Sequence, residues 1–146
     1  MDPQKIQIIT DWCGGKLICG DPSGMVSGIS TDSRSIRPGE LFLALSGERF
    51  DGYEFLRAAL ESGASGVVVS SPIDNFKERW PDRSLIVVEE TLVALTAIAR
   101  KYREHFEIEA IAVTGSNGKT TTKDLIGQLL SAEMETLVAP ASYNNL

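Results

Sequence analysis

The sequence predicts an α/β protein in two parts: a small α/β domain over residues 1–107, and the start of a parallel-sheet domain over residues 108–146. Two stretches carry this prediction. Residues 41–70 have the patterns of strand, helix and strand, and residues 108–139 repeat that order around a glycine-rich turn. Strands that alternate with helices are typical of parallel sheets. Two strands are too few for the second sheet, so we expect the chain to be a fragment.

Composition and charge are those of an ordinary soluble protein. The 146 residues are 42% hydrophobic and 23% charged, and the net charge of −6 gives no electrostatic reason to expect nucleic acid or an anionic membrane as a partner. No apolar run approaches the length of a membrane helix, and the N-terminus lacks the pattern of a signal peptide. Cys13 and Cys19 have no metal-ligand spacing to each other or to His105. We expect a cytoplasmic protein with reduced thiols, acting as a monomer.

The remaining elements follow from hydrophobic spacing and from Gly, Pro and capping residues. Asp2-Pro3 indicates the start of a helix that ends at Gly14, and Thr91 is expected to cap a later helix. The predicted elements before residue 108 are helix 3–13, strand 26–29, strand 41–45, helix 53–62, strand 66–70, strand 85–88 and a helix from residue 91 to about residue 102.

The most informative stretch is the turn TGSNGKTT at residues 114–121. It follows an apolar run at residues 108–113, typical of a buried strand, and precedes a helix with apolar residues at helical spacing. Gly115 and Gly118 allow the backbone to curl and to present its N–H groups. Such a turn at a helix N-terminus binds phosphate. The alternative is a turn that only joins a strand to a helix.

The residues of this turn predict ATP with Mg²⁺ as the ligand. Lys119 would bring its charge near the β- and γ-phosphates, and the Thr120 hydroxyl would bind Mg²⁺. Two residues rather than four separate the glycines, and Val113 stands where the common G-x-x-x-x-G-K-[ST] loop has its first glycine. The predicted ATP-binding residues are Gly115, Ser116, Asn117, Gly118, Lys119, Thr120 and Thr121, and among these Lys119 and Thr120 are the predicted catalytic residues.

Two polar loops precede and follow strand 41–45. Residues 30–40 combine hydroxyl side chains with Arg34 and Arg37, a set that can bind phosphate oxygens. The turn at residues 46–53 lies at the carboxyl end of a strand in a βαβ unit, where ligands gather. The alternative for residues 30–40 is a solvated loop.

These stretches resemble one family. TGSNGKTTTKDLI is similar to the shortened ATP loop of the Mur ligases, which add amino acids to the UDP-muramyl precursor of peptidoglycan, and of their folylpolyglutamate synthase relatives. STDSR, PGELFLALSGERFDG and AALESGASGVVV, in that order before it, resemble the N-terminal UDP-binding domain of the MurE and MurF branches. Ser116, Lys123-Asp124 and Asn144-Asn145 look most like the MurF branch, which adds D-alanyl-D-alanine.

The resemblance implies a UDP site in residues 1–107. The Asp-Ser-Arg turn of the family contacts UDP, and the turn after the next strand surrounds the uracil. The residues that match these positions are Thr31, Ser33, Arg34, Glu48, Arg49 and Phe50. Ser33 is the best candidate for a pyrophosphate contact, whereas Asp32 is expected to be structural, because Asp commonly accepts bonds from turn N–H groups.

The implied activity is that of an ATP-dependent ligase. ATP and Mg²⁺ would activate the carboxylate of UDP-N-acetylmuramoyl-tripeptide as an acyl phosphate, and the amine of D-alanyl-D-alanine would attack it. The family's acidic metal ligand and C-terminal domain do not match any part of these 146 residues, so we expect the chain as given to be inactive. Two alternatives stay open: a MurE-type ligase that adds the third amino acid, and a noncatalytic module that binds a UDP-sugar.

Overall fold

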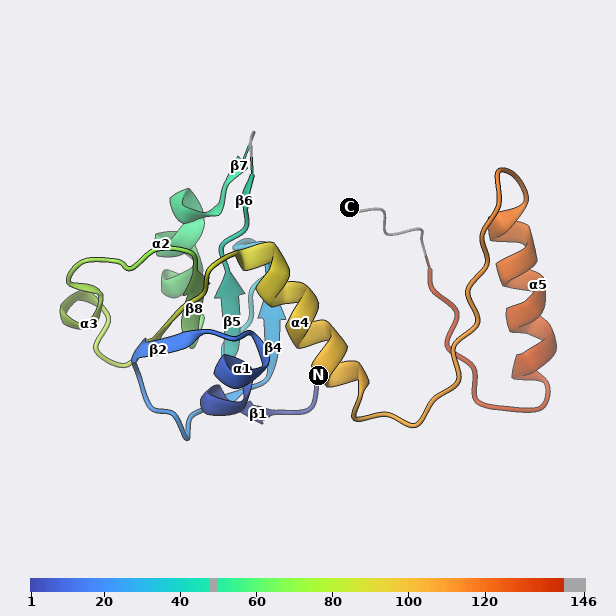
Figure 1. Ribbon diagram of the computed structural model, residues 1–146, viewed down its shortest axis with the longest axis horizontal. Coiled ribbons are helices and arrows are strands. Elements are labelled where there is room, and N and C mark those ends of the chain that lie inside the picture. The colour runs from blue at the N-terminus through green and yellow to red at the C-terminus, as the bar shows by residue number, and fades with distance from the viewer. Residues whose placement is uncertain (48–49, 141–146) are drawn as a thin grey trace. The chain divides into compact units, whose positions relative to one another are not determined.

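The computed structural model describes residues 1–47 and 50–140 and divides the chain into two units (Figure 1). The first unit is Met1–Phe106, and the second unit begins at Glu107. Among the described residues, no helix has the length and apolar content that are needed to cross a membrane. Cys13 and Cys19 are both free thiols.

A five-stranded sheet forms the centre of the first unit. Its strands are β2 (Lys16–Cys19), β4 (Gly28–Ser30), β5 (Glu40–Leu43), β8 (Gly66–Val69) and β9 (Ser84–Val87), in the spatial order β2-β9-β8-β5-β4. Neighbours among β4, β5, β8 and β9 pair in parallel, and β2 pairs antiparallel with β9 at one edge. Central strands such as β8 are buried along their whole length, which explains their continuous apolar sequence.

Helices cover both faces of this sheet. One core lies under α1 (Ile6–Trp12) and α4 (Thr91–Arg103) and includes Leu41 and Ile86. The other lies under α2 (Leu56–Glu61) and α3 (Phe76–Arg79) and includes Phe42. A 3₁₀ turn, η1 (Gly52–Phe55), leads into α2. The predicted unit of strand 41–45, helix 53–62 and strand 66–70 is therefore confirmed as β5, η1–α2 and β8.

Two small antiparallel pairs complete the first unit. The first joins β1 (Gln4–Lys5) to β3 (Met25–Val26). The second is the hairpin of β6 (Ser46–Gly47) and β7 (Phe50–Asp51), in which Ser46 pairs with Asp51. We call residues 46–51 the β6–β7 hairpin.

Four predictions about this unit were wrong, and one of them is the single strand at residues 26–29, which the structure divides between β3 and β4. The first helix begins at Ile6 rather than residue 3, because Gln4 and Lys5 pair with β3 instead of entering the helix. Strand β2 was not predicted; it is short and pairs with a strand almost 70 residues further along the chain. Thr91 does not cap α4 but is its first residue, and Glu90 occupies the N-cap position without a side-chain bond.

The described residues of the second unit contain one helix, α5 (Lys119–Ser131), where the sequence predicts it. The strands predicted at residues 108–113 and 136–139 are not formed. A helix satisfies its hydrogen bonds internally, whereas a strand needs a neighbour, and the described part of this unit offers none. Ile108 and Ile111 are accordingly 59% and 63% exposed.

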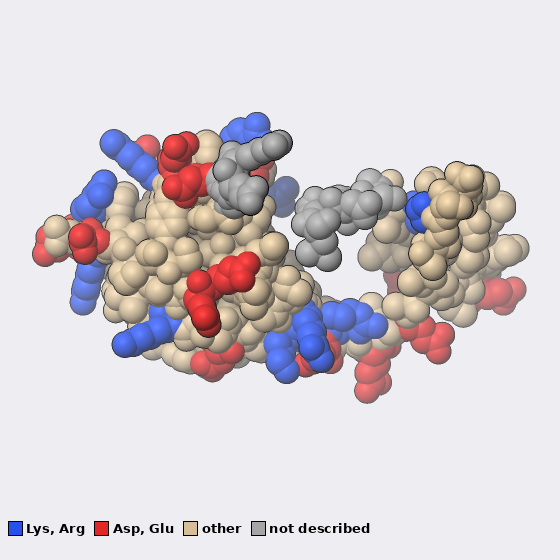
Figure 2. Space-filling view, turned by 45° about the horizontal axis from the view of Figure 1, so that its top comes forward, with Lys and Arg blue, Asp and Glu red and all other residues tan. Residues whose placement is uncertain are grey.

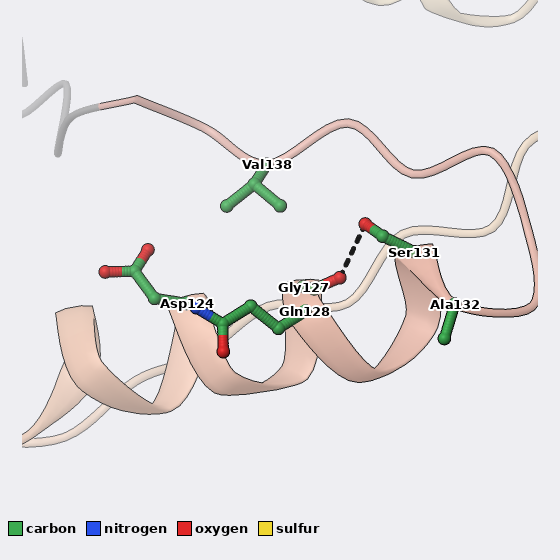
Figure 3. Close-up of a pocket in the computed structure, with 6 residues that line it drawn as sticks. All are labelled: Asp124, Gly127, Gln128, Ser131, Ala132 and Val138. Atoms are coloured by element: carbon green, nitrogen blue, oxygen red, sulfur yellow. Dashed lines mark hydrogen bonds between the residues drawn. The ribbon is translucent and has the colours of Figure 1, made fainter.

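Residues 136–139 instead cross one face of α5. Figure 3 shows the Val138 side chain over Gly127, the only buried residue of the helix. A Cβ on Gly127 would lie 2.4 Å from Val138 Cγ2, so glycine is required for this approach. The Lys123 ammonium donates to the Ala139 carbonyl. A surface hollow of about 630 Å³ beside this contact is lined by Asp124, Gly127, Gln128, Ser131, Ala132 and Val138, none of them in the predicted phosphate turn.

Candidate nucleotide-binding sites

The described residues of the predicted UDP site follow the carboxyl ends of two neighbouring strands of the first unit. Strands β4 and β5 are parallel neighbours, with Ser30 opposite Phe42 at their carboxyl ends. The chain leaves these ends as the loop of residues 31–34 and the β6–β7 hairpin, so both segments start from the same edge (Figure 1). Crevices at the carboxyl ends of parallel strands are the usual ligand sites of such sheets.

Ser33 is the most buried polar residue of the loop after β4, at 8% exposure. Its hydroxyl forms no hydrogen bond with the described part of the chain. No fully buried polar side-chain atom of the described residues lacks a partner, so Ser33 Oγ must still reach solvent. A hydroxyl held in place by burial and left without a partner is available to a ligand. Thr31, beside it, is half-buried.

Asp32 and Arg34 hold each other in the same loop. The Arg34 backbone N–H donates to Asp32 Oδ1 at 2.9 Å, and its guanidinium donates through Nη2 to Oδ2 at 2.7 Å and through Nε to Oδ1 at 2.9 Å. These hydrogen bonds lower the pKa of Asp32 from 3.8 to about 2 and raise the pKa of Arg34. Asp32 is therefore the structural member of the turn that the sequence predicts, and it fixes the Arg34 guanidinium at the loop.

The base of the β6–β7 hairpin is closed by backbone and side-chain bonds. The Gly52 N–H donates to the Leu45 carbonyl at 2.8 Å, and the Tyr53 N–H donates to Asp51 Oδ1 at 3.0 Å. The Tyr53 hydroxyl accepts from the Ser71 N–H at 2.5 Å and donates to the Ser71 carbonyl at 3.2 Å. Tyr53 thus ties the hairpin to the loop after β8. The sequence gives no signal for this contact.

The predicted uracil-contacting residues are only partly described. Phe50 lies in β7, where it pairs with Gly47, while Glu48 and Arg49 lie outside the described residues. Strands β6 and β7 nonetheless follow the carboxyl end of β5, as the sequence predicts for this turn.

The turn before α5 has the backbone expected of a phosphate-binding turn. Gly115 and Gly118 have φ of +148° and +75°, values that L side chains rarely adopt, and Gly118 is the N-cap. The first helical bond runs from Thr122 N–H to the Gly118 carbonyl at 2.9 Å, so the N–H groups of residues 119–121 precede it. The first turn carries no acidic residue that would repel an anion.

Lys119 brings its charge to this turn. Its ammonium donates to the Gly115 carbonyl at 2.5 Å and to the Ser116 carbonyl at 3.4 Å. Asn117 and Thr121 are exposed, as is Thr120. Thr120 can offer one oxygen to Mg²⁺, but no group of three His, Cys, Asp or Glu side chains among the described residues could hold a metal ion. Asn144 and Asn145 lie outside the described residues.

Elsewhere in the first unit, some of the exposed charges form local pairs. Figure 2 shows Lys and Arg side chains interspersed with Asp and Glu over its visible face. Arg57 pairs with Glu61 at 2.7 Å, and Lys101 pairs with Glu104 at 3.0 Å. Such exposed pairs contribute little to stability. The charged end of α4 is therefore a solvent-facing surface rather than part of either site.

Comparisons with known proteins point to one family. The family model described as "Mur ligase family, catalytic domain" matches residues 25–126, and that of "Mur ligase middle domain" matches residues 113–145. The chain is 46% identical over 120 residues to the UDP-N-acetylmuramoyl-tripeptide--D-alanyl-D-alanine ligase of Synechocystis sp., which covers 82% of this chain and 26% of that protein. It is 40% identical over 107 residues to a UDP-N-acetylmuramoyl-L-alanyl-D-glutamate--2,6-diaminopimelate ligase of Syntrophomonas wolfei, which covers 72% of this chain and 21% of that protein.

Solved structures share the fold. MurF from Acinetobacter baumannii aligns with a TM-score of 0.80 and 35% identity, over 92% of this chain and 29% of that one. MurF from Thermotoga maritima, solved in complex with ADP, aligns with a TM-score of 0.62 and 34% identity, over 72% of this chain and 23% of that one.

The chain spans about a quarter of the length of the curated relatives it matches. The matched region starts before the loop of residues 31–34 and includes the phosphate turn of residues 114–121. Because this match covers residues 25–126, more than half of the chain, the protein belongs to the Mur ligase family.

Proposed function

We propose that this chain is the nucleotide-binding part of an ATP-dependent ligase that adds D-alanyl-D-alanine to UDP-N-acetylmuramoyl-tripeptide. The observation that carries the proposal is the 46% identity to a ligase of that name over 82% of the chain. The glycine-rich turn at the N-terminus of α5 supports it, because a turn of this kind can bind the phosphates of ATP. The reaction would take place in the cytoplasm and would need no second copy of the chain.

In this proposal, residues 1–107 bind the UDP end of the substrate. Ser33 Oγ donates to a pyrophosphate oxygen, and Thr31 and Arg34 bind beside it. The uracil lies against the β6–β7 hairpin, where Glu48, Arg49 and Phe50 would contact it. Binding energy from UDP then positions the distant peptide carboxylate, a use of remote binding that is common in enzymes.

Residues 108–146 begin the ATP-binding domain. The N–H groups at the start of α5 and the Lys119 ammonium bind the phosphates and offset the charge that develops during phosphoryl transfer to the peptide carboxylate. For this, Lys119 must exchange its bonds to the Gly115 and Ser116 carbonyls for phosphate oxygens. The resulting acyl phosphate is attacked by the amine of D-alanyl-D-alanine, with release of phosphate.

Mg²⁺ fits this site only in part. Thr120 would supply one oxygen ligand, and Mg²⁺ commonly takes the others from phosphates, water and a carboxylate. When bound, the ion would neutralise phosphate charge. We propose that its carboxylate ligand belongs to a part of the ligase other than the described residues.

A ligase that adds a single amino acid is the second candidate. The 40% identity to a diaminopimelate-adding ligase favours it, because much of the matched region is common to both branches. An activity assay of a full-length ligase that contains this chain distinguishes the two candidates. The enzyme is supplied either with D-alanyl-D-alanine or with diaminopimelate, each together with its own UDP precursor. Turnover with the single amino acid and none with the dipeptide would contradict our proposal.

UDP binding can be tested on the chain as given. A ligand that binds only the folded state at a hundredfold excess over Kd stabilises it by about 2.7 kcal/mol, which raises the melting temperature of a domain of this size by roughly 10–20 °C. We expect millimolar UDP to raise it more than ATP with Mg²⁺ does, and Ser33→Ala to reduce the UDP effect. A folded chain that UDP does not stabilise would count against the site. The noncatalytic alternative would be favoured if residues 1–146 bind a UDP-sugar and a full-length protein containing this chain does not hydrolyse ATP.

A further inference from the structure

The N-terminus of α4 presents hydrogen-bond donors that the first unit does not use. Its first helical bond runs from the Ala94 N–H to the Glu90 carbonyl at 3.0 Å. The N–H groups of Thr91, Leu92 and Val93 precede this bond, and the N-cap residue Glu90 makes no side-chain cap. Within the described residues, no backbone carbonyl accepts from these three N–H groups.

Thr91 adds an unpartnered hydroxyl at the same place. The residue is only 2% exposed, yet its hydroxyl makes no hydrogen bond to the described part of the chain. Since no fully buried polar side-chain atom there lacks a partner, the small exposed area must include Thr91 Oγ1. The hydroxyls of Thr10 and Thr96 instead donate to the carbonyls four residues before them, at 2.8 and 2.9 Å. Thr91 is the first helical residue and has no preceding turn to bond to.

The surroundings of this N-terminus select the kind of ligand. Glu89 and Glu90 are exposed and form no ion pair with any described residue, so their carboxylates repel an anion but can accept a hydrogen bond. Leu92 and Val93 are exposed apolar residues of the first turn. A flat, neutral group that carries both carbonyl oxygens and an N–H fits this combination of donors, acceptors and apolar surface.

Sheet topology brings this N-terminus to the proposed UDP edge. Strand β9 ends at Val87, just before α4, and runs parallel to β8, β5 and β4. At about 4.8 Å between neighbouring strands, the start of α4 lies roughly 10 Å along the edge from the end of β5 and roughly 14 Å from the end of β4. Figure 1 shows the start of α4 and the β6–β7 hairpin at the same end of the sheet. These separations suit a nucleotide whose pyrophosphate lies at Ser33.

We propose that the N-terminus of α4 recognises the hydrogen-bonding edge of a uracil ring whose other side faces the β6–β7 hairpin, with Thr91 as the residue that determines base specificity. The inference rests on the proposed binding of UDP at this edge. Thr91 Oγ1 and the adjacent N–H groups donate to uracil carbonyl oxygens, and a carboxylate of Glu89 or Glu90 accepts from the N3–H. Cytosine has an amino group and an unprotonated N3 in these positions, so it leaves a donor and a carboxylate unpaired.

Calorimetric titration of the chain with UDP, CDP and inorganic pyrophosphate tests this proposal. We expect the parent to prefer UDP to CDP, and Thr91→Val to weaken UDP binding about three- to tenfold, the effect of one hydrogen bond, with pyrophosphate binding unchanged. Thr91→Ser keeps the hydroxyl and should retain UDP affinity. Thr91→Val should not lower the melting temperature, because the Thr91 hydroxyl bonds to none of the described residues.

Thr10→Val is the matched control. Thr10 is as buried as Thr91, but its hydroxyl bonds to the Ile6 carbonyl, so this variant should lose stability and keep its UDP affinity. The role of α4 would be overturned, and the UDP site left intact, by either of two results. One is a UDP affinity of Thr91→Val equal to that of the parent, and the other is a parent protein that binds CDP as tightly as UDP. Absence of UDP binding by the folded parent would overturn both proposals.

Discussion

A methyl group at Gly52 should disturb the β6–β7 hairpin at its base. A Cβ there would lie 2.5 Å from the Leu45 carbonyl oxygen and 2.8 Å from two backbone atoms of Ala44. Backbone atoms cannot rotate away as a side chain can, so the strand end or the turn must shift. Overpacking of this kind typically costs about 1–3 kcal/mol, and each kcal/mol lowers the melting temperature of a domain of about 100 residues by roughly 4–8 °C.

Gly52→Ala is therefore expected to melt at least several degrees below the parent and to respond less to UDP, because the Gly52–Leu45 bond closes the hairpin. Gly14→Ala is the matched control: Gly14 has φ of +63° and no atom within 4 Å of a Cβ, so only backbone strain of about 1 kcal/mol is added. Circular dichroism melts with and without UDP separate the two effects. A Gly52→Ala protein that melts with the parent and shows the same UDP response would refute this account of the hairpin base.

Three further predictions concern single side chains. Lys119→Ala in a full-length ligase should lower activity about ten- to a hundredfold, the effect of one charge-assisted contact, with an unchanged melting temperature; activity within twofold of the parent would remove Lys119 from the site. The folded-state pKa of Asp32 lies below its ordinary value of 3.8, so the stabilisation it gives through Arg34 is present above about pH 4 and is lost as the pH falls through about 2. The stability difference between the parent and Asp32→Asn should shrink over that range in urea titrations, and a constant difference would contradict the pairing. Burial raises the pKa of Cys13, whereas Cys19 is only half-buried, so a thiol reagent at pH 8 should modify Cys19 before Cys13. Mass spectrometry should therefore detect slower modification of Cys19→Ser than of the parent, and an equal rate would contradict this order.

The sequence predicts those elements of the fold whose secondary structure is determined by residues adjacent in the sequence. Strand β8 is β-branched and apolar throughout, and η1–α2 ends just before Gly63, so the βαβ unit is visible from local pattern alone. Strand β2 is not, because its four residues alternate in burial over too short a length, and its pairing with β9 is a long-range contact. At the N-terminus the Asp2-Pro3 signal is overridden by pairing of β1 with β3.

The candidate site divides in the same way. The turn from Gly115 to Thr121 is predicted because glycine spacing and a following helix are local features. Tyr53 and Ser71 are 18 residues apart and meet only because β5 and β8 are neighbours. Thr91 has the pattern of an ordinary helix cap, and its unpartnered hydroxyl becomes evident only from its burial and its missing bond.

The two nucleotide sites also differ in what holds them together within this chain. The loops of the UDP edge stand on a sheet with two buried cores, so their positions are fixed by packing. The predicted phosphate turn has its two glycine conformations and the following helix, but the described residues of the second unit form no strand. Leu129 and Leu137 are accordingly 74% and 98% exposed. Full burial of each such side chain is worth about 1.5–3 kcal/mol. In our proposal, phosphate binding in residues 107–140 would therefore depend on helix α5, the turn before it and Lys119, whereas UDP binding would have the support of the packed first unit.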